Sequence, residues 1–306
     1  MTRFTRRRFI QSIAGIGAAL LALPRPAWLA TAKQPIQKSI PASGESLAVI
    51  GMGTSRTFNV AGDPQSMAQL SAVLDAFFDH GGALIDSSPM YGNAERVLGE
   101  LLSQAERKDL FAATKVWIDG KQAGVEQMEQ SRRLWGVDRF DLMQIHNLRD
   151  WRTHLETLKA CKAEGRVRYI GITTSHGHDH EELAAILERE PFDFVQFSFN
   201  IANRIAEERL LPLAADRGMA TLINRPFQRG DLFRRIQGKA LPDWATDYDI
   251  ASWGQFFLKF IASHPAVTCV IPATSKVDHM VDNMGANYGR LPDAETRQRM
   301  IQYFES

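Results

Sequence analysis

Three short apolar runs in this chain of 306 residues each end in an ionisable side chain: Asp86, Lys115 and His146. Tyr91 follows the first run closely. One such residue at a strand end is usually a capping or surface group, but several together indicate a site that can donate protons and hydrogen bonds. Since a buried lysine is costly without a carboxylate, we expect Asp86 to pair with Lys115. The alternative to a catalytic role is that this ion pair only joins two strands.

These side chains need a scaffold that brings the ends of their strands together. From residue 46 onward, short apolar runs alternate with segments whose apolar residues recur at helical spacing. The sequence predicts eight strands, at 47–51, 83–86, 110–115, 142–146, 169–173, 194–197, 220–224 and 268–272. Eight such units predict an α/β fold, a single-domain (β/α)8 TIM barrel, with catalytic groups at the carboxyl ends of its strands. A doubly wound open sheet is the alternative, weakened because no Gly-x-Gly-x-x-Gly follows the first strand.

Composition and charge exclude several classes of protein. The chain is 44% hydrophobic and 23% charged, which excludes a wholly disordered, collagen-like or disulfide-framework chain. Residues 1–32 hold five arginines and no acid, and the remainder has 31 basic against 35 acidic residues. A mildly acidic body is a poor nucleic-acid binder. The two cysteines, Cys161 and Cys269, fall on distant units, and we expect both to be unpaired and buried.

The first 32 residues have the layout of a targeting segment. Thr5-Arg6-Arg7-Arg8-Phe9-Ile10 precedes a moderately apolar run at 13–23 and a small-x-small pattern at 30–32. This layout resembles a bacterial twin-arginine (Tat) signal peptide, which implies the Tat export machinery as a partner, a periplasmic location and no stable membrane anchor after cleavage. An uncleaved anchor or a basic tail is the alternative. Residues 33–45 are predicted to be a linker before a barrel domain at 46–306.

Several motifs in the predicted barrel resemble the aldo/keto reductase family. They are Leu84-Ile85-Asp86-Ser87-Ser88-Pro89-Met90-Tyr91-Gly92-Asn93-Ala94-Glu95, Thr114-Lys115, Ile145-His146, Gly165-Arg166-Val167-Arg168-Tyr169-Ile170-Gly171 and Val270-Ile271-Pro272. The resemblance implies a barrel that reduces aldehydes or ketones with NADPH, NADH being possible, without a Rossmann fold. It implies a catalytic tetrad of Asp86, Tyr91, Lys115 and His146, with Tyr91 as general acid and its pKa lowered by Lys115.

The resemblance also assigns cofactor residues, with departures. Gly53, Thr54 and Gln196 match the family, but Thr173-Thr174 replace the common Ser-Asn and Asn224 replaces an aromatic ring that stacks on the nicotinamide. Phe227 is an alternative stacking surface. Arg225 is predicted to reach the pyrophosphate or a substrate carboxylate.

The segment after the last predicted strand is expected to bind the adenosine end. Thr274, Ser275 and Lys276 are placed to meet its phosphate, and Asp282 and Asn283 match the pair that binds adenine. His279 falls where the family often has Arg, so a preference for NADPH depends mainly on Lys276. In the loops after other strands, three aromatic residues are predicted to line the substrate pocket: Trp117, Trp151 and Phe199.

Other functions remain open at this point. The departures at Thr174 and Asn224 permit a catalytically weak barrel that acts as a cofactor-sensing or binding module. The run of His176, His178 and His180 permits a metal-dependent hydrolase, although we expect a polar loop and no metal site. No motif in the sequence identifies the substrate or the oligomeric state.

Overall fold

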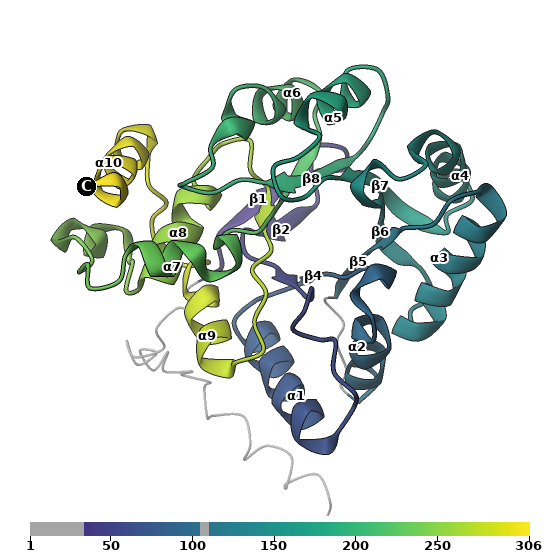
Figure 1. The fold of residues 1–306 in the computed structure, drawn as a ribbon, viewed down its shortest axis with the longest axis horizontal. Helices are drawn as coiled ribbons and strands as arrows, with labels where there is room; N and C mark the ends of the chain where they lie inside the picture. Colours follow the sequence, from purple (N-terminus) through teal and green to yellow (C-terminus); the bar gives the residue numbers. More distant parts are fainter. Residues whose placement is uncertain (1–33, 105–109) are drawn as a thin grey trace, which may run out of the picture. The chain divides into compact units, whose positions relative to one another are not determined.

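Eight parallel strands in sequential order form the centre of the fold in a computed structural model, which describes residues 34–104 and 110–306 (Figure 1). They are β3 (Met52–Gly53), β4 (Leu84–Asp86), β5 (Phe111–Val116), β6 (Phe140–Ile145), β7 (Val167–Thr173), β8 (Phe194–Ser198), β9 (Ala220–Asn224) and β10 (Cys269–Val270). A parallel bridge from Ile50 to Val270 joins the two edges. The predicted (β/α)8 barrel is therefore confirmed, and the open sheet is excluded.

Helices surround the strands on the outside of the barrel (Figure 1). They are α1 (Pro64–Asp79), α2 (Ala94–Leu102), α3 (Lys121–Trp135), α4 (Trp151–Ala163), α5 (His180–Leu187), α6 (Leu210–Asp216), α7 (Asp231–Arg235), α8 (Trp253–Ala262), α9 (Val277–Gly285) and α10 (Ala294–Glu305). α1 shows how the sequence fixes a helix start. The side chain of Asp63 accepts a hydrogen bond from the Ser66 amide at 2.9 Å, and Pro64 occupies the first turn, where its missing N–H costs nothing.

The barrel has two apolar layers. The larger one lies between the strands and the helices. The smaller one fills the barrel with side chains that include Leu84, Phe111, Phe194 and Leu222. Because side chains alternate along each strand, one face of every strand supplies each layer.

A hairpin packs against the inner layer. It consists of β1 (Gln37–Ser39) and antiparallel β2 (Ser46–Ala48), and its residues Ile40 and Leu47 belong to that inner cluster. The predicted linker at 33–45 is thus wrong for its described part, and the first barrel strand is β3 instead of 47–51. Pro41 and Gly44 favoured a linker, but they form the turn of this hairpin. The proposed signal at 1–32 lies outside the described residues.

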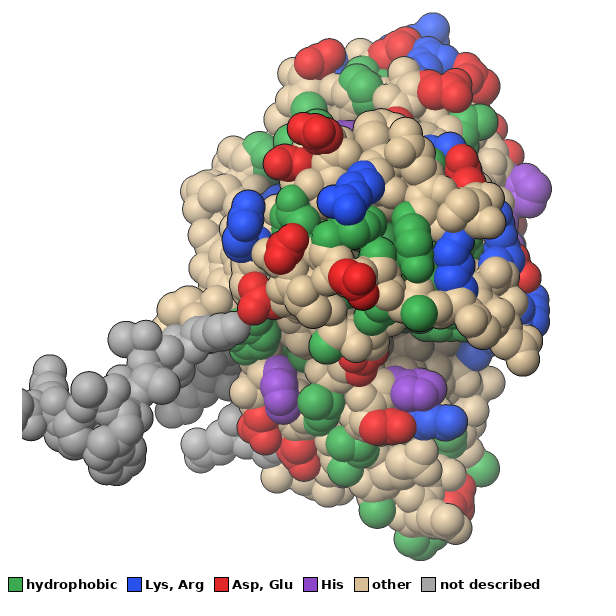
Figure 2. Space-filling view, turned by 90° about the vertical axis from the view of Figure 1, so that its left-hand side faces the viewer, with side chains coloured by type: hydrophobic (Ala, Val, Ile, Leu, Met, Phe, Trp, Pro, Cys, Tyr) green, Lys and Arg blue, Asp and Glu red, His purple; other side chains and the backbone are tan. Residues whose placement is uncertain are grey.

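No helix in the described ranges combines the length and the apolar character needed to cross a membrane. The face shown in Figure 2 carries interspersed acidic and basic side chains, without one dominant sign.

Candidate active site

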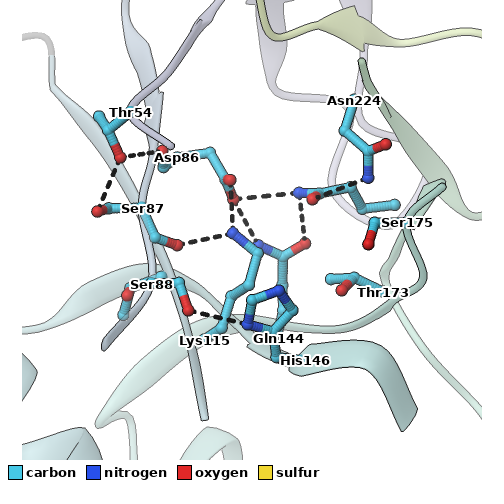
Figure 3. Close-up of polar contacts among 12 residues, drawn as sticks. Thr54, Asp86, Ser87, Ser88, Lys115, Gln144, His146, Thr173, Ser175 and Asn224 are labelled. Carbon is cyan, nitrogen blue, oxygen red and sulfur yellow. Dashed lines mark hydrogen bonds and ion pairs between the residues drawn. The ribbon is translucent and has the colours of Figure 1, made fainter. Parts of the chain in front are cut away.

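Asp86 and Lys115 form a buried ion pair at the carboxyl ends of β4 and β5. Lys115 Nζ lies 2.5 Å from Asp86 Oδ2 and 2.7 Å from the Ser87 carbonyl oxygen (Figure 3). The lysine side chain is 0% exposed. Burial by itself would lower the pKa of Lys115, but the charges and hydrogen bonds of Asp86 and Tyr91 outweigh burial and raise it. The lysine therefore stays charged.

Two glutamines hold the other oxygen of Asp86. Gln144 and Gln196 donate to Asp86 Oδ1 at 2.8 and 3.1 Å, and Gln196 also donates to Gln144 Oε1 at 3.2 Å (Figure 3). The sequence analysis gave Gln144 no role. A signal was present, because Gln144 stands two residues before His146, and alternate residues of a strand share a face.

Tyr91 lies against both Lys115 and His146. It ends the 3₁₀ turn η2 (Pro89–Tyr91), which Ser88 caps through the Met90 amide. The Tyr91 ring centroid lies 5.8 Å from that of His146 and 5.2 Å from Lys115 Nζ. The charge of Lys115 favours the ionised phenol and so lowers the pKa of Tyr91. The four predicted catalytic residues thus meet at one end of the barrel.

The pKa of Tyr91 differs from the expectation. Burial raises it above its usual value, Lys115 opposes that rise, and the charge of Asp86 adds to it. Lys115 therefore lowers the pKa of Tyr91, as predicted, but desolvation of the phenolate outweighs this one ammonium and the net pKa is raised. The consequence suits a general acid, since the phenol keeps its proton at neutral pH.

His146 is held as a neutral imidazole. Burial, and then the charge of Lys115, place its pKa well below the usual value. Its Nδ1 lies 2.9 Å from Ser88 Oγ (Figure 3). If Ser88 donates this bond, Nε2 carries the hydrogen and is free to donate to a substrate oxygen. Ser88 is a second functional residue that the sequence analysis missed.

Several predicted cofactor residues lie beside this group. Gly53 ends β3 and Thr54 follows it. Thr54 Oγ1 lies 3.0 Å from the Asp86 carbonyl oxygen and 2.8 Å from Ser87 Oγ. Thr173 Oγ1 accepts from the Asn147 amide at 3.3 Å. The Oγ1 atom of Thr174 is buried and has no hydrogen-bond partner within the described chain. Such an atom is suited to a ligand that supplies the missing partner.

Asn224 is engaged by its neighbours. Its Nδ2 donates to the Thr174 carbonyl oxygen at 2.9 Å and contacts Gln196 Oε1 at 3.3 Å, and its Oδ1 accepts from Ser198 Oγ at 2.6 Å. It supplies no aromatic face. Phe227 packs at 5.0 Å from the Phe233 ring and at 6.5 Å from the Phe257 ring, so it belongs to the packing of α7 and α8.

Lys276 is exposed at the start of α9 and makes no ion pair within residues 34–104 and 110–306, and its amide donates to Thr274 Oγ1 at 3.1 Å. The Ser275 carbonyl oxygen accepts from Gln69 Nε2.

Asp282 ties α9 to the start of α8. Ser252 Oγ donates to Asp282 Oδ2 at 2.7 Å, and Gln255 Nε2 donates to Oδ1 at 3.0 Å. Asn283 is buried beside it. Asp282 is thus fixed in position by α8, and its contact with adenine stays a prediction.

The three aromatic residues predicted to line the substrate pocket lie in different surroundings. Trp117 lies 6.4 Å from the His146 ring, in place to border a substrate. Trp151 packs on the outer core beneath Arg152. Phe199 is 0% exposed and packs on Phe260 and His264, so its predicted place in the pocket is wrong. The alternation of strand β8 continues through Phe197 to Phe199 and turns both away from the barrel interior.

Neither the histidine run nor the cysteines form a site. Both ring nitrogens of His176 are engaged, by Ser175 and by Arg229, and no group of three or more potential metal ligands gathers in the part of the chain that the structure describes. Cys161 and Cys269 are buried and unpaired, as predicted.

Comparison with known proteins agrees with this geometry. The model of the aldo/keto reductase family matches residues 49–299. The aldo-keto reductase YhdN of Bacillus subtilis is 26% identical over 212 residues, which cover 63% of this chain and 62% of that protein. The NADH-specific methylglyoxal reductase of Escherichia coli is 24% identical over 245 residues, or 68% of this chain and 73% of the relative.

Solved structures share the fold. A crystal structure of an aldo/keto reductase from Klebsiella pneumoniae in complex with NADP and acetate superposes with a TM-score of 0.70 at 24% identity, and the match covers 85% of this chain and 93% of that one.

Proposed function

We propose, because the chain belongs to the aldo/keto reductase family, that it reduces aldehyde or ketone carbonyls to alcohols with a nicotinamide cofactor. The observation that carries this proposal is the convergence of Tyr91, Lys115 and His146 around a buried Asp86. A neutral phenol, a charged lysine and a neutral imidazole in one place can protonate an oxygen, and this is what reduction of a carbonyl needs.

Each of the four side chains then has a task. Tyr91 gives its proton to the carbonyl oxygen as the carbon is reduced, and it regains a proton from solvent. Lys115 stabilises the phenolate that this transfer leaves, and Asp86 keeps Lys115 charged and in position. His146 donates a hydrogen bond to the same oxygen and so fixes the direction from which the carbonyl is approached.

The residues present fit a nicotinamide cofactor. The unpartnered Oγ1 of Thr174 and the amide of Gln196 are suited to a carboxamide, and the exposed Lys276 at the start of α9 is suited to a phosphate. When bound, the nicotinamide supplies the hydride. Asn224 offers no aromatic surface on which the nicotinamide ring could stack, so we expect the cofactor to bind more weakly.

We favour NADPH over NADH on the charge of Lys276. His279 stands at the position where the family often has Arg. It has no guanidinium group that could bind a phosphate through two hydrogen bonds. One relative is named an NADH-specific enzyme, so the preference is to be measured with both cofactors.

The test is consumption of NADPH over a panel of carbonyl compounds by the wild type and by Tyr91→Phe. We expect the variant to lose about 10²- to 10⁴-fold in kcat/KM, because it keeps the ring but not the proton. Equal rates in the two proteins would refute the assignment of Tyr91 as the acid.

A cofactor-binding module without turnover is a second candidate, and the replacement of an aromatic ring by Asn224 is the observation that favours it. The quenching of protein fluorescence by NADPH separates the two. Binding without reduction of any carbonyl would support the module, whereas turnover would exclude it.

We also propose that the protein is exported to the periplasm through the twin-arginine machinery, on the basis of the sequence layout of residues 1–32. Cell fractionation of the wild type and of an Arg6→Lys, Arg7→Lys double variant tests this. We expect periplasmic protein only for the wild type; the same distribution for both would contradict export by this route.

A further inference from the structure

The catalytic group lies between two sets of loops. The loops after β7, β8 and β9 carry predicted cofactor residues, among them Arg225, which lines a pocket of about 340 Å³ next to Asn224. β5 stands across the barrel from β9 in the strand order, and the loop after β5 carries Trp117, whose ring centroid lies 6.4 Å from that of His146. This indole is half-buried, so part of its surface is left to contact a substrate.

Arg149, in the loop after β6, covers the Trp117 ring. Its Cζ lies 4.9 Å from the ring centroid. Asp119 holds the guanidinium there, because Nε donates to Asp119 Oδ1 at 2.9 Å and Nη2 donates to Oδ2 at 2.7 Å. Two such bonds fix the plane of a guanidinium, and the π electrons of an indole attract its charge. Arg149 therefore joins the loop after β6 to the indole that borders the catalytic imidazole.

The backbone at Trp117 is fixed by other residues. Its amide donates to Gln127 Oε1 at 2.6 Å, and Gln127 Nε2 donates to its carbonyl oxygen at 3.4 Å. The next carbonyl oxygen, that of Ile118, accepts from His154 Nε2 at 2.6 Å. These partners come from α3 and α4 and do not involve Arg149. Loss of the Arg149 side chain therefore acts on the indole and leaves this backbone held.

The segment directly after the catalytic imidazole is strained, and it carries Arg149. Asn147, Leu148 and Asp150 have positive φ, at 52°, 56° and 45°, whereas Arg149 has a φ of −65°. Residues with a Cβ avoid the left-handed region unless their surroundings impose it, and such residues gather at binding and catalytic sites. Asp150 helps to impose it, because its Oδ2 accepts from the Gly120 amide at 2.8 Å. The strained segment thus directs Arg149 toward the loop after β5.

The ion pair of Arg149 and Asp119 is not needed for the fold. Their side chains are 35% and 68% exposed, and exposed ion pairs add little to stability. A variant without this pair should therefore stay folded. What the pair does is geometric, since it keeps the guanidinium over one indole.

We propose that Arg149 is a positioning residue of this site: it holds the Trp117 indole in place beside His146, and so decides how tightly carbonyl compounds that carry a ring are bound. This inference rests on the proposed reductase function. An aromatic ring gains energy by packing on an indole, and a side chain that is fixed before binding saves the entropy of ordering it. A small aliphatic aldehyde has no ring to pack there and should not depend on Arg149.

The experiment compares benzaldehyde with propanal in the wild type and in Arg149→Met, which keeps an unbranched side chain but removes the charge. We expect the variant to lose about fivefold in kcat/KM for benzaldehyde, mainly through a raised KM, and to keep kcat/KM for propanal within about twofold. Arg152→Met is the matched control, because Arg152 stacks at 4.4 Å on Trp151, which packs on the outer core. The control should change the kinetics of neither aldehyde.

A double variant shows whether Arg149 acts through the indole. In the Trp117→Leu background, Arg149→Met should no longer change the ratio of kcat/KM for benzaldehyde to that for propanal. An undiminished effect in that background would overturn the inference. Equal losses for the two aldehydes in Arg149→Met would also overturn it, because they would indicate a general disturbance of the site.

A measurement without turnover separates this inference from the proposed function. In protein labelled with 5-fluorotryptophan, the fluorine resonance of Trp117 is identified by its loss in Trp117→Phe. We expect one sharp line in the wild type and in Arg152→Met, and a broadened or split line in Arg149→Met, because the indole is released. If the line responds in this way but no carbonyl compound is reduced, the reductase function fails and the hold of Arg149 on Trp117 stands. A line that stays single and sharp in Arg149→Met overturns the inference whatever the activity.

Discussion

At the scale of single residues, the account depends on how His146 is held. Its Nδ1 contacts Ser88 Oγ, and that oxygen also accepts from the Met90 amide. The Met90 amide takes one lone pair of Ser88 Oγ and leaves the serine hydrogen available to donate to Nδ1 of the neutral ring. A neutral ring bonded in this way presents Nε2–H to the substrate.

Substitution of Ser88 by Ala should therefore lower kcat/KM for carbonyl reduction by about 10-fold, because the ring loses its orientation while Tyr91 stays intact. Ser87→Ala is the matched control, since the Ser87 hydroxyl contacts Thr54 and not His146. Steady-state kinetics of both variants decide the matter. Equal losses in the two, or no loss in Ser88→Ala, would remove Ser88 from the account.

The pH dependence follows from the same residues. Burial raises the pKa of Tyr91 and lowers that of His146, so neither group titrates near neutrality. We expect kcat/KM for reduction to stay flat between about pH 7 and pH 9. A rate profile with a neutral aldehyde checks this. An inflection in that range that vanishes in His146→Asn would show that the imidazole titrates after all.

The residue types of the site could be predicted from the sequence, but the neighbours that hold them could not. Asp86, Lys115 and His146 each end an apolar run, which marks them as functional. Gln144 and Ser88 are ordinary polar residues, and only the register of β5 with β6, in which Lys115 lies opposite Gln144, shows what Gln144 contacts. The net pKa of Tyr91 needed the degree of burial, which no spacing reports.

At the scale of elements, a second buried carboxylate joins α2 and α3 to β5. Glu95 of α2 accepts from Thr114 Oγ1 at 2.5 Å, from Ser131 Oγ at 2.8 Å and from Trp135 Nε1 at 3.2 Å. Thr114 is the neighbour of Lys115 on β5, so the hydrogen bonds to Glu95 also fix the position of the lysine backbone.

Replacement of Glu95 by Ala should lower the free energy of unfolding by about 3 kcal/mol, because three buried donors lose their acceptor. Glu95→Gln should cost clearly less, since it keeps the shape and one acceptor. Its neutral amide also suits the site, because burial raises the pKa of Glu95. Urea unfolding of both variants is the measurement, and equal destabilisation by Gln and Ala would contradict this role.

The strands in the middle of the eight-stranded sheet could be predicted from the sequence. The first and last elements of the barrel were predicted less well. The hairpin β1–β2 was missed because Pro41 and Gly44 suggest a linker in sequence, whereas the strand nature of Gln37–Ser39 comes from pairing with Ser46–Ala48. The last strand is only Cys269–Val270, since Pro272 has no N–H to continue the ladder.

At the scale of the whole molecule, buried neutral histidines make the stability depend on pH. Burial, then Arg297 and Lys38, lower the pKa of His264 from 6.5 to about 4. Between these values the unfolded chain binds more protons than the folded one, so stability is lost as the pH falls from 6.5 toward 4. Protonation would also break the bond that His264 Nδ1 accepts from the Ala266 amide at 3.2 Å.

The free energy of unfolding, measured in urea at pH 7 and at pH 5, should therefore fall more for the wild type than for His264→Asn. His146 titrates in the same direction and is present in both proteins, so the difference isolates His264. An identical fall in the two would show that His264 does not contribute.

The closed barrel has an apolar interior and places the polar catalytic residues at one end. Apolar side chains fill its interior, and the β1–β2 hairpin packs against them. The polar group of Asp86, Tyr91, Lys115 and His146 lies where β4, β5 and β6 end. This separation of a packed interior from a polar end is what the alternating sequence pattern predicted.

The most direct test of the central claim follows a labelled hydrogen. NADPH that carries deuterium at C4 on the transferred side is incubated with the protein and a carbonyl compound, and the alcohol is examined by mass spectrometry. We predict one deuterium on the carbinol carbon with the wild type, and a yield reduced by about two orders of magnitude or more with Tyr91→Phe. Alcohol without the label, or an undiminished yield from the variant, would contradict the account.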